Sequence, residues 1–111
     1  MPGDFDSDAA FRGEVIRVLH SLLEQVDDLE SDDHDPQLSD GNLKTVFESG
    51  GTYVLSQQTP LHELWLSAEL QAWHFGREAG QWVERDTGEK MIDVLSRLFS
   101  DKLGMDIRFE L

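Results

Sequence analysis

Seven carboxylates lie within twelve residues of one another in the stretch EQVDDLESDDHD, with no lysine or arginine among them. The residues concerned are Glu24, Asp27, Asp28, Glu30, Asp32, Asp33 and Asp35, and His34 lies between the last two. Carboxylate oxygens are hard ligands that suit Mg²⁺, Ca²⁺, Mn²⁺ and iron, and a neutral imidazole can add a further ligand. The stretch is therefore a candidate metal site, and also an anionic surface that a basic protein surface would attract.

The acidic stretch begins inside a predicted helix. Apolar residues at three- and four-residue steps predict an amphipathic helix over about residues 7–30, with Ser7 as its N-cap. Glu24, Asp27 and Asp28 fall opposite the apolar stripe in the last turns, where each carboxylate costs about 0.3–1 kcal/mol before screening. A solvated surface that only maintains solubility is the alternative. Carboxylates that cost stability and lack basic neighbours favour a cationic partner instead.

No enzyme or calcium motif accounts for these residues. A calcium-binding loop that began at Asp28 would place Asp33 where glycine is required. The segment HELWL fails as a zinc-protease helix, because Leu66 stands where the second histidine belongs. The sequence has no P-loop, nucleophile elbow or dinucleotide fingerprint. It also has no cysteine, which excludes disulfides, thiolate zinc sites and cysteine-held iron–sulfur clusters.

The remaining sequence predicts a sheet followed by a second helix. Short runs of strand formers, separated by turns at SDGN (39–42), Gly50-Gly51 and REAG (77–80), predict five or six antiparallel strands over about residues 35–85. A helix over about 87–103 would begin at a capping box of Asp86 and Glu89 and end at Gly104.

The expected fold is therefore α+β: a two-layer sandwich with two terminal helices on one face of a five- to six-stranded antiparallel sheet. Residues 1–111 would form one domain. We expect residues 1–6 to be frayed and the tail, 105–111, to be extended.

The net charge of −14 makes nucleic acid an unfavourable partner, because phosphates would be repelled. The excess lies in residues 1–43, where twelve acidic residues face Arg12 and Arg17 alone, a net of −10. No apolar run is long enough for a membrane span, and the N-terminus lacks the pattern of a signal or transit peptide. We therefore expect a cytoplasmic protein, without a membrane role.

Trp65 is the candidate contact residue in the predicted sheet. It lies in the strand HELWLS (62–67), with Leu64 and Leu66 on the opposite face. If the leucines face the helices, Trp65 is exposed beside Gln58, and exposed tryptophan is a common interface hot spot. The opposite orientation would place Trp65 in the core, and strand alternation alone leaves both open. Trp73 and Trp82 are predicted to be packing residues.

The sequence resembles the frataxin family, most closely its bacterial CyaY-type homologues. The resemblance extends from about Ala10 to Phe109. It rests on the acidic helix that continues into an acidic strand and on three segments: GTYVLSQQTPLHELWLS (51–67), AWHF (72–75) and QWVERDTGE (81–89). Thr45 departs from the family pattern, because an apolar residue is usual there.

The resemblance implies an iron-binding protein of iron–sulfur cluster assembly and iron homeostasis. It implies weak binding of Fe²⁺ and Fe³⁺ at the acidic residues, with other divalent cations as further ligands. It also implies docking on the cysteine desulfurase and its scaffold protein through Glu24, Asp27, Asp28, Gln58 and Trp65. A monomer is expected, with metal-driven oligomers in some conditions.

Three functions are compatible with the sequence. The first is a non-catalytic iron chaperone and regulator. The second is a ferroxidase, which would be an enzyme, although the paired Glu-x-x-His motifs of a buried di-iron site are absent from the sequence. The third is an acidic adaptor without a metal role.

Overall fold

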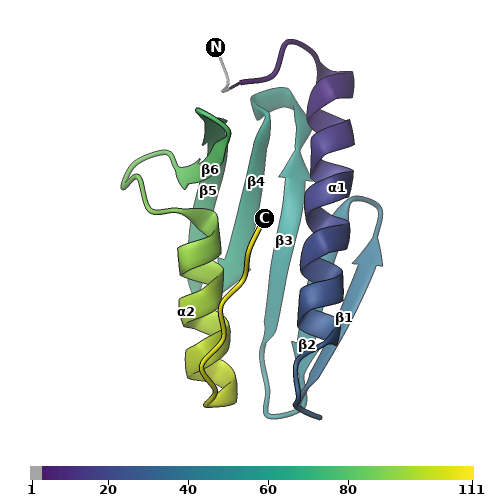
Figure 1. The fold of residues 1–111 in the computed structure, drawn as a ribbon, viewed down its shortest axis with the longest axis vertical. Coiled ribbons are helices and arrows are strands. Elements are labelled where there is room, and N and C mark those ends of the chain that lie inside the picture. Colours follow the sequence, from purple (N-terminus) through teal and green to yellow (C-terminus); the bar gives the residue numbers. More distant parts are fainter. Residues whose placement is uncertain (1–3) are drawn as a thin grey trace.

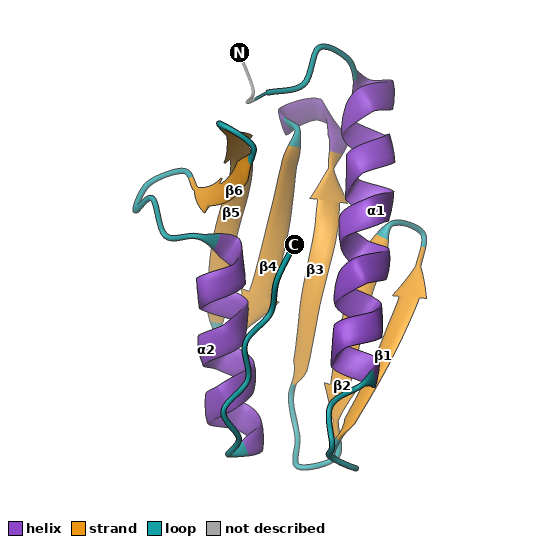
Figure 2. Cartoon of the chain, in the orientation of Figure 1, coloured by secondary structure: helices purple, strands orange, loops and turns teal. Residues whose placement is uncertain are grey.

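The computed structural model describes residues 4–111, and in them two helices cover one face of an antiparallel sheet (Figures 1 and 2). The helices are α1 (Asp8–Asp27) and α2 (Met91–Leu103). The strands are β1 (His34–Ser39), β2 (Asn42–Phe47), β3 (Thr52–Gln58), β4 (Glu63–Ala68), β5 (Gln71–Glu78) and β6 (Gln81–Glu84), with a short 3₁₀ helix, η1 (Thr59–Leu61), before β4. Each strand pairs with the next, in the order β1-β2-β3-β4-β5-β6. The predicted α+β sandwich is confirmed.

Helix α1 begins as predicted and ends earlier than predicted. The Ser7 side chain accepts a hydrogen bond from the N–H of Ala10 at 3.1 Å, which is the expected N-cap. The helix ends at Asp27 with Asp28 as its C-cap, whereas the predicted end was residue 30. Its last turn has no basic residue to stabilise the helix end. Leu29 lies beyond the helix and packs against the edge of the core.

The first residues that the structure describes are anchored, so the predicted fraying at 1–6 is wrong for residues 4–6. Phe5 is buried and packs edge-on against Phe11. The Asp4 carboxylate accepts hydrogen bonds from the N–H groups of Ala79 (3.3 Å) and Gly80 (2.8 Å) in the β5–β6 turn. Residues 1–3 of that prediction lie outside the described residues.

Four tight turns join the strands, and the sequence predicted three of them. One is the β2–β3 turn, where Gly50 and Gly51 have φ of 113° and 90°. Asp40 and Gly41 both have positive φ, as the SDGN segment predicted for the β1–β2 turn. The segment REAG likewise contains the β5–β6 turn at its end. The β4–β5 turn is formed by Glu69 and Leu70, at φ 50° and 62°. Neither residue is a usual turn former. Strand β5 extends to Glu78, so the first two residues of REAG lie in the strand and not in the turn.

Helix α2 does not begin with the predicted capping box. It begins at Met91, and the side chain of the N-cap residue Lys90 makes no capping hydrogen bond. Asp86 instead belongs to a loop whose N–H groups turn toward the Glu84 carboxylate, and Glu89 pairs with Arg97 at 3.2 Å. The predicted C-cap is confirmed, because Gly104 has a φ of 64°.

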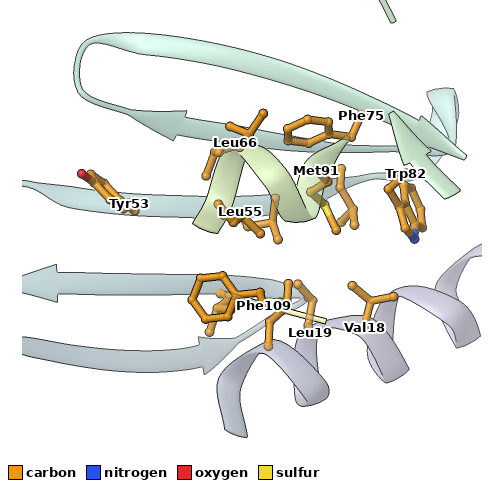
Figure 3. Close-up of a cluster of buried hydrophobic side chains, with 14 of the residues drawn as sticks. Val18, Leu19, Tyr53, Leu55, Leu66, Phe75, Trp82, Met91 and Phe109 are labelled. Atoms are coloured by element: carbon orange, nitrogen blue, oxygen red, sulfur yellow. The ribbon is translucent and has the colours of Figure 1, made fainter. Parts of the chain in front are cut away.

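The core fills the space between the two layers (Figure 3). Trp73 and Trp82 are buried, as predicted. The extended tail passes between the helices, where Phe109 is buried and its N–H donates to Ser96 Oγ at 2.9 Å (Figure 1). No helix within residues 4–111 is long and apolar enough to cross a membrane.

Candidate functional site

The seven predicted carboxylates follow one another around the end of α1, through the connection after it and into β1. We call these seven residues the acidic ridge. Six of them are exposed: Glu24, Asp27, Asp28, Glu30, Asp32 and Asp35. The structure therefore gathers the predicted residues at one end of the helix, where the negative end of the helix dipole adds to their charge.

Asp33 differs from the rest of the ridge because its carboxylate is already bonded. Its two oxygens accept hydrogen bonds from the N–H and the hydroxyl of Ser49, both at 2.7 Å. The hydroxyl bond, followed by the backbone bond, lowers the pKa of Asp33 from its ordinary value. Asp33 thus ties the turn between β2 and β3 to the start of β1. Its role in the fold is structural, whatever cation the exposed carboxylates attract.

His34 is turned inward from the acidic ridge. Its Nε2 lies 2.7 Å from the carbonyl oxygen of Val26, and a carbonyl can only accept, so Nε2 carries a proton. Its Nδ1 is buried and has no partner among the described residues. The side chain therefore joins β1 to the last turn of α1. In this conformation neither ring nitrogen is available to a cation on the ridge.

The ridge is a diffuse anionic surface. Within residues 4–111, no three histidine, aspartate or glutamate side chains are close enough together to hold one metal ion. A hard cation on such a surface would keep most of its water ligands and bind weakly. The same charges would also attract a basic protein surface, in a manner that salt screens.

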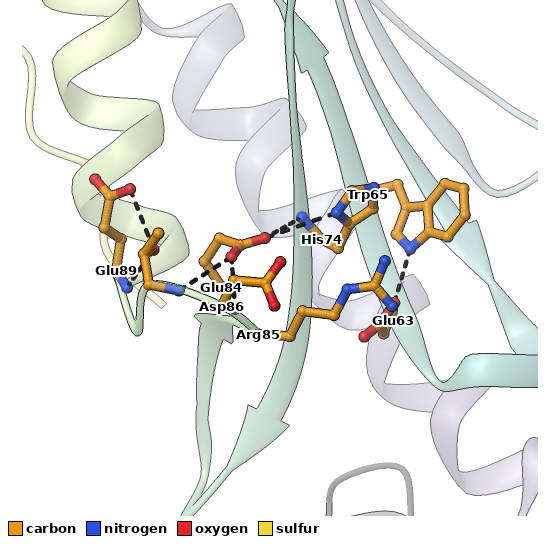
Figure 4. A network of polar contacts seen from close by, with 8 residues as sticks. Glu63, Trp65, His74, Glu84, Arg85, Asp86 and Glu89 are labelled. Carbon is orange, nitrogen blue, oxygen red and sulfur yellow. Dashed lines mark hydrogen bonds and ion pairs between the residues drawn. The ribbon is translucent and has the colours of Figure 1, made fainter.

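Trp65 lies on the outer face of the sheet, away from the helices. Leu64 and Leu66 are buried on the inner face, so the open question of strand orientation is answered in favour of the exposed alternative. The Trp65 indole is half-buried, donates to Glu63 Oε1 at 2.9 Å, and packs edge-on against His74 at 4.7 Å between ring centroids (Figure 4). Gln58 pairs with Glu63 across β3 and β4 and lies on the same face.

The polar network that surrounds Trp65 was not predicted from the sequence. Arg85 lies 3.6 Å from Glu63, and His74 Nδ1 lies 3.7 Å from Glu84 (Figure 4). The available signal was the strand register, since Trp65 pairs directly with His74 once β4 and β5 are aligned. These contacts fix the orientation of the indole, which lowers the entropy that a partner would have to remove on binding.

The fold and these two surfaces define a small α/β-sandwich protein with an acidic helix–strand junction and a tryptophan on its sheet. The family model for the frataxin-like domain matches residues 4–105. The chain belongs to the frataxin family, and membership implies an iron-related role in iron–sulfur cluster assembly, in a family that is generally non-catalytic.

Solved structures of this family share the fold. Frataxin from Psychromonas ingrahamii, of the CyaY group, superposes with a TM-score of 0.86 at 20% identity, over 95% of this chain and 99% of that one. Trimeric frataxin from the yeast Saccharomyces cerevisiae superposes with a TM-score of 0.67 at 25% identity, over 94% of this chain and 86% of that one.

Proposed function

We propose that this protein is an iron-binding regulator of iron–sulfur cluster assembly that docks on a cysteine desulfurase and its scaffold protein. The observation that carries the proposal is the set of six exposed carboxylates at the negative end of α1, with no basic residue in the last turn of that helix. This surface suits a weakly held iron ion and a basic partner alike. The two would therefore compete or cooperate at the ridge.

The outer face of the sheet supplies the second part of the proposed partner surface. Trp65 there is oriented by Glu63 and His74, and Gln58 lies beside it. An oriented, half-buried tryptophan is the kind of residue that contributes most to interface affinity. We infer that the ridge steers the partner by charge and that Trp65 provides the contact that holds it.

A metal-independent adaptor is the second candidate. It is favoured by the diffuse arrangement of the carboxylates, because no three ligands converge within the described residues. The ferroxidase alternative would require catalytic oxygen consumption well above that of free iron. Cytoplasmic location and iron-driven oligomers stay predictions.

Binding to a purified cysteine desulfurase across a salt series, with and without Fe²⁺ under anaerobic conditions, tests the proposal. The ridge variant combines Glu24→Gln, Asp27→Asn and Asp28→Asn. We expect it to bind the desulfurase about tenfold more weakly at low salt, because three surface charges contribute roughly 0.5 kcal/mol each. We also expect its binding to depend less steeply on salt than that of the wild type, because three of the six exposed ridge carboxylates are removed. The matched control removes the same charges elsewhere, with Glu78→Gln, Asp86→Asn and Asp101→Asn, all exposed.

Trp65→Ala tests the sheet surface separately. A hot-spot loss of about 2 kcal/mol would weaken binding roughly 30-fold, with little change in salt dependence. Val54→Ala on the same face is the control. Equal binding by the ridge variant and its control would contradict the docking role. Fe²⁺ binding that is unchanged in the ridge variant would contradict the iron role and leave the adaptor.

A further inference from the structure

A cavity of about 200 Å³ lies between the two helices and β6, outside the surfaces of the proposed function. Glu14 and Arg17 of α1 line one side of it, and Lys90, Met91 and Ile92 at the start of α2 line the other. Trp82 of β6 and Leu111 also line it. Glu14 precedes Glu24 by ten residues along α1, which places the cavity roughly 15 Å from the ridge.

Trp82 presents a hydrogen-bond donor that nothing in the described chain satisfies. The side chain is only 5% exposed, and its indole Nε1 is buried without a partner among residues 4–111. Figure 3 shows this nitrogen pointing away from the sheet, toward the side on which α1 lies. A buried N–H without an acceptor costs about 1–3 kcal/mol, so an acceptor at this point would stabilise the protein.

The donor lies in the part of the molecule where positive charge gathers. Arg77 stands directly opposite Trp82 in the β5–β6 ladder, and its Nε is also buried without a partner in the described residues. Lys90 takes part in none of the ion pairs formed within residues 4–111. Glu14 is the acidic side chain of the cavity lining; it is bonded to Arg17 at 2.6 and 2.8 Å and lies 3.9 Å from Arg77.

The start of α2 also favours a negatively charged ligand in this cavity. The first turn of a helix has N–H groups without acceptors inside the helix, and the N-cap Lys90 supplies no side-chain acceptor. A helix N-terminus of this kind favours negative charge. In a chain with a net charge of −14, this cavity is therefore a place where an anion meets a locally positive surface.

We propose that the cavity binds a compact organic acid, whose carboxylate accepts a hydrogen bond from Trp82 Nε1 and pairs with Lys90 and Arg17. The volume fits, since a cavity of about 150 Å³ holds benzene. The apolar lining from Ile92 and Leu111 favours an organic body over inorganic phosphate, which would leave these side chains uncovered. Arg17 is 57% exposed at its side chain, so it can move to admit the ligand.

The indole N–H resonances of the ¹⁵N-labelled protein report on this site directly, and Trp82→Phe assigns the Trp82 signal. Benzoate is the probe, with inorganic phosphate and sodium chloride at matched ionic strength as comparison arms. We expect benzoate to shift the Trp82 resonance saturably, with a dissociation constant of about 1 mM, while Trp65 and Trp73 stay in place. Lys90→Gln should weaken benzoate binding about threefold to fivefold, and Lys44→Gln, at an exposed lysine on β2, should not.

Three outcomes would overturn the proposal. If no anion moves the Trp82 resonance beyond the effect of sodium chloride, the indole binds water only. If phosphate moves the Trp82 resonance and benzoate does not, the ligand is an inorganic anion and not a compact organic acid. If Lys90→Gln and Lys44→Gln bind benzoate equally well, the Lys90 side chain does not pair with the carboxylate of benzoate.

Discussion

Glu84 shows how one buried carboxylate can organise a loop and a functional surface together. Its oxygens accept hydrogen bonds from the N–H groups of His74 (2.9 Å), Asp86 (2.7 Å) and Thr87 (3.2 Å). Burial alone would raise its pKa, but the three backbone bonds, together with the His74 ring, hold the pKa of Glu84 below its ordinary value. The loop before α2 and the strand behind Trp65 therefore depend on one ionised group.

Replacing Glu84 by glutamine should destabilise the protein by about 1–3 kcal/mol, because one of its two acceptor oxygens becomes an N–H₂ donor. A lowered folded-state pKa contributes stability above the unfolded-state pKa of about 4.5, and this contribution is lost as pH falls through the folded value. Below pH 4.5 the wild type should lose stability more steeply than Glu84→Gln. Urea unfolding at several pH values measures both effects.

Glu78→Gln is the control for this comparison, because Glu78 is an exposed glutamate at the end of β5. It should change the free energy of unfolding by no more than about 0.5 kcal/mol. A Glu84→Gln protein whose stability follows the wild-type pH profile would contradict the role assigned to the carboxylate.

At the scale of elements, the sequence predicts those helices and turns that depend on local periodicity and turn residues. It does not predict the features that depend on contacts between distant parts of the chain. The stripe of α1, its Ser7 cap and the Asp40-Gly41 turn follow from local patterns. The start of α2 does not, because Asp86 is drawn into the loop that Glu84 organises. The anchoring of Phe5 likewise depends on an aromatic pocket that exists only after folding.

The candidate site was predictable to the same extent. The acidic ridge is contiguous in sequence, so its position at a helix end could be predicted from the helix period. The inward orientation of His34 could not be predicted, because the Val26 carbonyl that holds it comes from another element. The exposure of Trp65 depended on which face of β4 the helices cover, which strand alternation alone leaves open.

The β4–β5 turn contains a strained residue with no packing to compensate for it. Leu70 has a φ of 62° and is fully exposed at 107% of its reference area. Left-handed backbone costs a leucine about 1–2 kcal/mol, part of which the greater freedom of unfolded glycine offsets. Leu70→Gly should therefore stabilise the protein by about 0.5–1 kcal/mol, measured as the free energy of unfolding in urea.

Gly41→Ala in the β1–β2 turn is the reciprocal change. Gly41 has a φ of 78°, and a Cβ there would overlap the side-chain amide of Gln57. It should destabilise the protein while Leu70→Gly stabilises it. A loss of stability in Leu70→Gly would indicate that the leucine makes a contact the structure does not contain.

At the scale of the whole molecule, the amount and the placement of negative charge both destabilise the folded state. The net charge is −14, and the ridge adds its carboxylates at the helix end that disfavours them. Self-repulsion of this kind destabilises the compact state, so sodium chloride should raise the melting temperature by screening. A cation that binds the ridge should raise it further than screening alone.

Melting curves under anaerobic conditions separate these two effects, with Fe²⁺ compared against sodium chloride at equal ionic strength. At ten times its dissociation constant, a ligand of the folded state adds about 1.4 kcal/mol, or roughly 5 °C for a chain of this size. The wild type and the triple control Glu78→Gln, Asp86→Asn, Asp101→Asn should both show this gain. The ridge variant should start from a higher melting temperature, because unfavourable carboxylates are gone, and should gain only the screening increment. An equal Fe²⁺ gain in all three proteins would mean that Glu24, Asp27 and Asp28 do not hold the iron, and that these three carboxylates serve the partner alone.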